Sequence, residues 1–445
     1  MHSIYLDHAA AAPLDPRVRE AMEPFLNEEY GNPSSIHERG RRAKEAIENA
    51  RKTVARILQC SPHEIVFTGS GTEANNLGIF GIARRYKKGH LITTAIEHHA
   101  VLRAMEALEK KGCEVTYLEV DQYGLIDSKK IKAALRPETI LVSVMYANNE
   151  IGTIEPIVEV GKVIRDYRKE KLKIENWKLK IQEKTPFFLV DACQAAGYLD
   201  INVEKLGVDL MALNGSKIYG PKGIACLYVR NGVELTPIIY GGGQEKGLRS
   251  GTENVAGIVG FARALEIAYQ EREKEGQRLA ALRDYFIKEI LQRLPGTVLN
   301  GHPSDRLPNN INISIPGIEG EAAVIYLDAR GIQCSTGSAC SAVSLEPSHV
   351  IAALAPLEAR PDRVGTAVAC GDLPLTGLGK SDEYTTGSLR FTLGRATTKG
   401  DIDYVMSVLP EIVKKLRGHG SSESEGFPPP AVQGRSIKSV VGCRG

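Results

Sequence analysis

Short apolar runs alternate with longer amphipathic runs through the first half of the chain, and this alternation most constrains the fold. The apolar runs are bounded by polar or Gly-rich turns, which is typical of buried strands. They cover residues 65–68, 91–94, 114–120, 140–146, 187–191, 208–213 and 224–229. Runs with apolar residues at helical spacing cover residues 39–59, 98–111, 128–135 and 157–168. The alternation predicts an α/β domain whose mostly parallel sheet is covered by helices on both faces.

The regular alternation of apolar and amphipathic runs ends after residue 251, where a smaller α+β domain is expected. Residues 254–294 read as one long helical stretch with a break near Gly276. A strand at 310–315, a helix at 320–330, a strand at 388–393 and a helix at 399–416 follow. We predict a large domain over 15–262, a small domain over 1–14 and 263–417 with an insertion at 355–379, and a disordered tail over 418–445. Residues 168–184, rich in Lys and Glu, read as an exposed helix extension.

Composition excludes several classes of protein. Lys plus Arg number 56 and Asp plus Glu number 54, so a net charge of +2 gives no overall field for nucleic acid or an anionic membrane. Eight scattered cysteines are too sparse for a disulfide framework and favour a reducing, cytoplasmic compartment. The first residues lack the apolar core of a signal peptide, and no apolar run is long enough to span a membrane.

Ligands of open parallel sheets bind outside the carboxyl ends of the strands, so the residues there are candidates. Gly69-Ser70-Gly71-Thr72 opens a helix and could bind an anion, or it could be an ordinary capped turn. Asp191 and Lys217 end two other strands, and separately they could be a helix cap and a surface lysine. Together they suit pyridoxal phosphate, where Lys forms the Schiff base and Asp pairs with the pyridinium nitrogen.

A Ser-, Gly- and Ala-rich stretch from Cys334 to Ser341 surrounds Cys340. This composition favours an accessible loop over a buried, inert thiol. The gap between the two cysteines is poor zinc spacing. His98 and His99 lack the context of a metalloprotease motif, and His98 could instead stack on a ring.

In combination, the motifs resemble the cysteine desulfurases of the NifS/IscS group, which are fold-type I, class V aminotransferase-like enzymes. The matching stretches run in family order over roughly residues 4–417. They are Tyr5–Ala10, Gly31–Ser35, Phe67–Asn76, Ile96–His98, Asn148–Gly152, Val190–Gln194, Lys217–Gly223, Arg249–Thr252, Ser335–Cys340 and Ser388–Arg395.

The resemblance implies how the ring of the cofactor would be held. Lys217 would carry the Schiff base and would remove the α-proton once released. Asp191 would pair with the pyridine nitrogen, and His98 would stack on the ring. Asn149 and Gln194 would contact the side of the ring that bears the hydroxyl.

The resemblance also implies the phosphate site. Gly71 and Thr72 would bind the phosphate at a helix N-terminus, and Thr252 would reach it from a partner subunit, which implies a homodimer. The family usually has Ser-Gly-His-Lys before the Schiff base, whereas this chain has Asn214-Gly215-Ser216-Lys217. Asn214 and Ser216 can still donate to phosphate, but the imidazole is absent.

For the substrate, the resemblance implies that Arg390, with help from Asn32, holds the carboxylate of L-cysteine. The Cys340 thiolate would take the sulfur as a persulfide and leave L-alanine. The sulfur would pass to an acceptor protein such as an Fe–S scaffold or a tRNA-thiolation relay. No metal is implied in the resting enzyme, although Cys340 could transiently ligate a nascent Fe–S cluster. A selenocysteine lyase, another PLP β-lyase or aminotransferase, and a non-catalytic scaffold stay open as alternatives.

Overall fold

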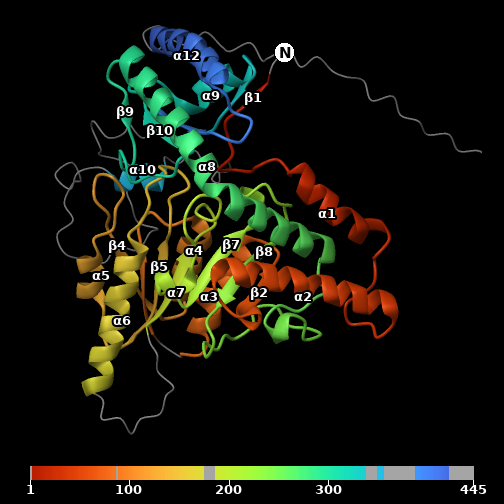
Figure 1. The fold of residues 1–445 in the computed structure, drawn as a ribbon. Helices are drawn as coiled ribbons and strands as arrows, with labels where there is room; N and C mark the ends of the chain where they lie inside the picture. The colour runs from red at the N-terminus through yellow and green to blue at the C-terminus, as the bar shows by residue number, and fades with distance from the viewer. Residues whose placement is uncertain (1–2, 87–88, 175–185, 337–347, 355–385, 420–445) are drawn as a thin grey trace, which may run out of the picture.

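The computed structural model describes residues 3–86, 89–174, 186–336, 348–354 and 386–419 (Figure 1). Its central feature is a seven-stranded sheet in the order β2-β8-β7-β6-β5-β3-β4. The strands are β2 (Ile65–Thr68), β3 (His90–Thr94), β4 (Glu114–Leu118), β5 (Thr139–Met145), β6 (Phe187–Asp191), β7 (Leu210–Asn214) and β8 (Ala225–Val229). Only β8 is antiparallel to its neighbours, so the expected mostly parallel sheet is confirmed.

Helices cover both faces of this sheet, because alternate residues of each strand are buried on opposite sides. On β7, Leu210 packs in one apolar cluster and Met211 in another. The helices are α1 (Pro16–Asn27), α2 (Glu38–Leu58), α3 (Gly71–Ala83), α4 (His99–Glu109), α5 (Ser128–Ala134), α6 (Ile157–Ile174) and α7 (Val203–Leu206). Three short 3₁₀ turns accompany them: η1 (Pro62–Glu64), η2 (Gly215–Lys217) and η3 (Glu245–Gly247). The near-continuous apolar sequence of the strands follows from this two-sided burial.

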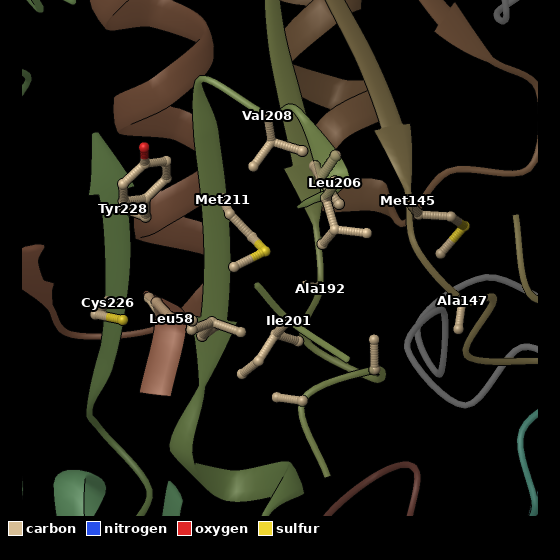
Figure 2. Packing of buried hydrophobic residues seen from close by; sticks show 14 of the residues in the cluster. Leu58, Met145, Ala147, Ala192, Ile201, Leu206, Val208, Met211, Cys226 and Tyr228 are labelled. Carbon is tan, nitrogen blue, oxygen red and sulfur yellow. The ribbon is translucent and has the colours of Figure 1, made fainter. Parts of the chain in front are cut away.

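One of these two cores is seen in Figure 2. The side chains of Met211 on β7 and Tyr228 and Cys226 on β8 gather there with Leu58, the last residue of α2. All four are fully buried. Their packing fixes the strands whose ends carry the candidate site.

A smaller α+β layer follows, as expected from the sequence. Its strands form two sheets, β12-β10-β9 and a parallel pair β1-β11. They are β1 (Ile4–Tyr5), β9 (Val298–Leu299), β10 (Asn310–Ser314), β11 (Ile332–Gln333) and β12 (Ser388–Thr392). The helices are α8 (Val255–Arg293), α9 (Gly320–Asp328), α10 (His349–Ala353) and α12 (Lys399–His419). A third core lies here, in which the rings of Phe286 and Phe391 are 5.2 Å apart.

Helix α8 joins one core of the large sheet to the core of the small layer. Phe261 packs in the core of the large sheet, and Phe286 packs in the core of the small layer. The break expected near Gly276 is wrong, because α8 is continuous from Val255 to Arg293. A single glycine costs a helix only about 1 kcal/mol, and packing at both ends of α8 outweighs it. Since one helix serves both cores, the domain boundaries stay a prediction.

Several expectations fall on residues outside the described ranges. They concern Cys340, the insertion at 355–379, most of the 418–445 tail, and the end of the 168–184 extension, whose first part is the last turn of α6. Within the described ranges, none of the helices combines the length and apolar character needed to cross a bilayer.

Candidate active site

The loops that carry the candidate residues share one edge of the large sheet. The pairings make β2, β3, β5, β6 and β7 run in the same direction, so their carboxyl ends lie together. At or just after these ends come Gly71 (β2), His98 (β3), Asn149 (β5), Asp191 (β6) and Lys217 (β7). This is the edge at which open parallel sheets bind ligands.

Asp191 is the last residue of β6 and is buried. Its Oδ2 accepts a hydrogen bond of 2.6 Å from Nδ2 of Asn75, on α3, and its Oδ1 accepts one of 3.0 Å from the N–H of Cys193. A buried carboxylate needs such donors, because burial without a partner is costly. The two bonds hold the carboxyl group in one orientation.

Lys217 ends η2, the single turn that follows β7. Its Nζ donates to the carbonyl of Ala10, in the N-terminal segment. Burial raises the pKa of the Cys193 thiol well above its ordinary value, the nearby Asp191 adds to the shift, and Lys217 opposes it. Both charged groups therefore lie within electrostatic range of Cys193, whose sulfur lies against Gly71 at the start of α3.

Gly71 begins α3 directly beside these groups. A methyl group built on Gly71 would lie 2.7 Å from Sγ of Cys193 and 3.4 Å from Cβ of Asn214, so no side chain fits without a shift. The N-cap Ser70 accepts from the N–H groups of Glu73 and Ala74. Among the described residues, the N–H groups of Gly71 and Thr72 have no acceptor. They are left for an anion, which the positive end of the helix favours.

Asn214 and Ser216 stand before Lys217, where the family usually has other residues. Oδ1 of Asn214 accepts from both the N–H and the hydroxyl of Ser216, at 3.2 and 3.3 Å. The pair therefore caps η2 and fixes the turn that presents Lys217. The amide nitrogen of Asn214 lies 3.6 Å from the methyl position built on Gly71, near the start of α3.

Arg390 reaches the same region from β12 of the small layer. Its guanidinium donates from Nη1 to the carbonyl of Asn149, at 3.0 Å, and from Nη2 to Oδ1 of Asp7, at 2.9 Å. Arg390 is 2% exposed, and its Nε has no partner among the described residues. A buried N–H without an acceptor is rare, and a substrate carboxylate would supply one.

The N-terminal segment that follows β1 forms one wall of the site, a role for which sequence reasoning gave no expectation. Asp7 pairs with Arg390, and the carbonyl of Ala9 accepts from Nε2 of Gln194, at 3.0 Å. The next carbonyl, that of Ala10, accepts from Lys217. The only sequence signal was that this segment lies within a family motif.

His98 caps the start of α4. Its Nδ1 accepts a hydrogen bond of 3.0 Å from the N–H of Ala100. A neutral ring that accepts at Nδ1 carries its proton on Nε2. The histidine is therefore held by the helix that it caps, with one ring nitrogen already engaged.

Glu97 is a buried acid that sequence reasoning missed. Its Oε1 accepts from the hydroxyl of Thr94 and the N–H of Met145, both at 2.8 Å. Burial raises the pKa of Glu97 to about 8, and the charge of Asp191 adds to the shift. Glu97 therefore carries a proton at neutral pH. Its position directly after a strand end was the signal that could have identified it.

Two predicted residues stay apart from this group. Asn32 is exposed, and its side-chain oxygen accepts from the N–H of Ser34. Thr252 is also exposed, beside the turn in which Gly251 donates to Gln244. Neither residue contacts the strand-end group within the described part of this chain. Cys340 lies outside the described residues.

The chain is similar to proteins of known family. It matches the family described as aminotransferase class-V over residues 4–405. It is 47% identical over 416 residues to the cysteine desulfurase IscS of Dictyoglomus turgidum, which covers 93% of this chain and 95% of that protein. It is 45% identical to the cysteine desulfurase IscS of Methanosarcina thermophila, with 93% of each chain covered.

Solved structures give the same picture. A NifS-like protein matches with a TM-score of 0.79 and 34% identity, covering 93% of this chain and all of that one (100%). A NifS-like protein from Rickettsia africae matches with a TM-score of 0.75 and 31% identity, covering 93% and 100% of the two chains.

Proposed function

This chain belongs to the class-V aminotransferase family, and we propose how its residues divide the work of the reaction. It is a pyridoxal-phosphate-dependent cysteine desulfurase of fold-type I. In our proposal the strand-end residues hold the cofactor, Arg390 holds the substrate, and Cys340 receives the sulfur. The observation that supports this most strongly is that Gly71, Asp191 and Lys217 all lie at or just after the carboxyl ends of β2, β6 and β7, on one side of the sheet.

The residues present fit the cofactor. Gly71 keeps the start of α3 free of a methyl group that would crowd Cys193, next to the two N–H groups without acceptors among the described residues. These groups and Thr72 would hold the phosphate, with Asn214 and Ser216 beside them. Asp191 would pair with the ring nitrogen, and His98, Asn149 and Gln194 would hold the ring. Bound PLP supplies an electron sink for the electrons left when the substrate loses its α-proton.

The other steps belong to side chains of this protein. Lys217 would hold the cofactor through Nζ, and the free amine would take the α-proton of the substrate at the same atom. Arg390 binds the substrate carboxylate through the donors that Asp7 and Asn149 leave open. Because Arg390 lies on β12 of the small layer, substrate binding would connect the two layers of the protein. Asn32 remains part of the proposed carboxylate site.

The thiols of the described residues support Cys340 as the sulfur acceptor. Burial raises the pKa of Cys60 and of Cys334 to about 12, and it raises the pKa of Cys226 as well. Cys113 directly precedes β4, so it lies at the amino ends of the parallel strands, away from the carboxyl ends that carry the candidate site. A thiol with a raised pKa is a poor nucleophile. Transfer of sulfur to Cys340 forms an S–S bond while the Cβ–S bond of the substrate breaks, so L-cysteine and a thiol give L-alanine and a persulfide.

The test compares two cysteine variants of the holoenzyme. Cys340→Ala should keep the cofactor absorbance and lose the persulfide, which mass spectrometry of the protein detects after incubation with L-cysteine. Cys334→Ala is the matched control and should form the persulfide on Cys340 at the ordinary rate. Sulfur release and alanine formation by Cys340→Ala at the control's rate would remove Cys340 from the mechanism.

We further propose a homodimer in which Thr252 completes the phosphate site of the partner. Ile36 is 91% exposed and Tyr240 is 72% exposed, and burial of these two side chains against another chain would remove their apolar surface from water. Light scattering of the holoenzyme measures the oligomeric state. The sulfur would then pass, in the cytoplasm, to an acceptor protein such as an Fe–S scaffold or a tRNA-thiolation relay, without direct contact with nucleic acid.

The alternatives are not favoured. Relatives over nearly the whole chain are named cysteine desulfurases, which favours cysteine over selenocysteine as the substrate and favours this reaction over that of another β-lyase. Lys217 and Asp191 are both in place, which argues against a scaffold that merely retains the fold. Alanine formation measured from cysteine and from selenocysteine separates the two substrates.

A further inference from the structure

Ser348 lies directly before helix α10, at the point where the described chain resumes after Cys340. It is buried, and its hydroxyl donates to Oε2 of Glu150, at 2.5 Å. Ser348 is also the N-cap of α10, because its hydroxyl oxygen accepts a hydrogen bond of 3.2 Å from the N–H of Ile351. The cap needs only the acceptor function of the hydroxyl, so the bond to Glu150 is an additional attachment to the loop after β5.

Glu150, which accepts the hydrogen bond from Ser348, is itself buried and held by other side chains. It is 5% exposed, and its backbone carbonyl accepts from the side-chain amides of Asn310 and Asn312, both at 3.1 Å. Burial raises the pKa of Glu150 to about 7, while the hydrogen bond from Ser348 and the charge of Arg390 oppose the shift. The preceding residue, Asn149, accepts from Arg390. Ser348 is thus tied to the same turn that holds the proposed substrate arginine.

His349 makes a second attachment to a different loop. Its Nε2 donates to the backbone carbonyl of Glu97, at 2.9 Å, and its ring lies 4.7 Å from the ring of His99. Burial lowers the pKa of His349 to about 4, so the ring is neutral at physiological pH. Glu97 and His99 are the neighbours of His98 in the sequence. The second attachment therefore reaches the loop of the proposed ring-stacking histidine.

We propose that Ser348 and His349 are positioning residues, which hold the start of α10, the first described element after Cys340 in the sequence, against the loops of Asn149 and His98. A single bond would allow α10 to turn about it, whereas two bonds to two loops fix its direction. The start of α10 is thereby set relative to the groups that hold the substrate and the ring. The proposal rests on the proposed function, because it concerns delivery of Cys340 to the sulfur of the substrate.

The test uses two separate variants of the holoenzyme, each of which removes one attachment. Ser348→Ala loses the donor to Glu150, and His349→Phe keeps a ring against His99 but loses the donor to Glu97. Ser348→Thr keeps the hydroxyl and should restore the ordinary rate. Ser407→Ala is the matched control, since it removes an exposed hydroxyl that donates to Tyr404 on α12.

Three readouts separate positioning from general damage. The change in cofactor absorbance on adding L-cysteine should stay within about twofold of wild type. Single-turnover formation of the persulfide on Cys340 should slow by about tenfold, the usual effect of one lost hydrogen bond of this kind. The rate at which iodoacetamide alkylates Cys340 without cysteine should rise, because α10, which follows Cys340 in the chain, is held by one bond fewer.

The outcomes decide the proposal. Persulfide formation and alkylation at wild-type rates in the two attachment variants would overturn it. If one variant does not fold, the other decides, because each bond is a separate attachment. If the wild-type protein itself forms no persulfide, the proposed function fails. The alkylation rates of Cys340 then judge the attachment alone.

Discussion

The proposed site has two halves that are built in different ways. The cofactor half, formed by Gly71, Asp191 and Lys217, stands on the strand ends of one sheet, so strand register alone brings its residues together. The substrate half joins distant parts of the chain, as in the Asp7–Arg390 pair, which spans 383 residues. One half therefore depends on a single sheet, and the other depends on the packing of the two layers. Substitutions should separate cofactor binding from substrate handling.

The largest separation is expected at Arg390. Arg390→Lys keeps the charge but cannot reach Asp7, Asn149 and a substrate carboxylate in the geometry of a fork. We expect KM for L-cysteine to rise by about ten- to a hundredfold, the cost of a charged hydrogen bond, with cofactor affinity unchanged. Steady-state kinetics together with absorbance titration of PLP measure both. A parallel loss of cofactor affinity would mean that the two halves are not separable.

A substitution at Gly71 should have the opposite and a smaller effect, because it should lower cofactor affinity and leave KM for L-cysteine nearly unchanged. The added methyl of Gly71→Ala would meet Sγ of Cys193 at 2.7 Å, so overpacking should lower PLP affinity by about tenfold and leave KM for cysteine nearly unchanged. Removing the sulfur in Gly71→Ala/Cys193→Ala should restore most of the affinity, and Cys193→Ala alone is the control. A double variant no better than the single one would show that the contact is not the cause.

The smallest effect is expected at Glu97, which is buried directly before His98, and it concerns stability. Its folded pKa of about 8 exceeds its ordinary value of 4.5, so the unfolded chain ionises first as pH rises. The contribution of Glu97 to the free energy of unfolding is fully present below about pH 4.5 and is lost progressively as the pH rises to about 8. Glu97→Gln cannot ionise and should gain on wild type by a few degrees in Tm between pH 5 and 8. Equal Tm profiles would mean that Glu97 is ionised in the folded protein.

Sequence reasoning placed most residues of the proposed cofactor half at strand ends because its signals are local. Asp191 and Lys217 each end an apolar strand pattern, and parallel strands end at one edge of a sheet. The turn at Gly71 follows the same rule. A strand is recognised from a few consecutive residues, and its end places the side chain that follows.

The substrate half was harder to predict because its partners are set by packing. Nothing near Asp7 in the sequence indicates that β1 pairs with β11 and so brings Asp7 beside β12. Glu97 was missed because a glutamate after a strand usually faces water, and only the surrounding layers bury it. The break expected near Gly276 was wrong for a related reason, since both cores stabilise α8.

The N-terminal segment implies an order in time as well as in space. Domains form as the chain is made, from its first residues onward. Ala10 is synthesised long before Lys217, and Asp7 long before Arg390, yet these are the residues that they contact. A nascent chain that ends before β12 has the strands of the cofactor half but lacks Arg390, the proposed substrate-binding residue. The proposed carboxylate site is therefore complete only after β12 has been made.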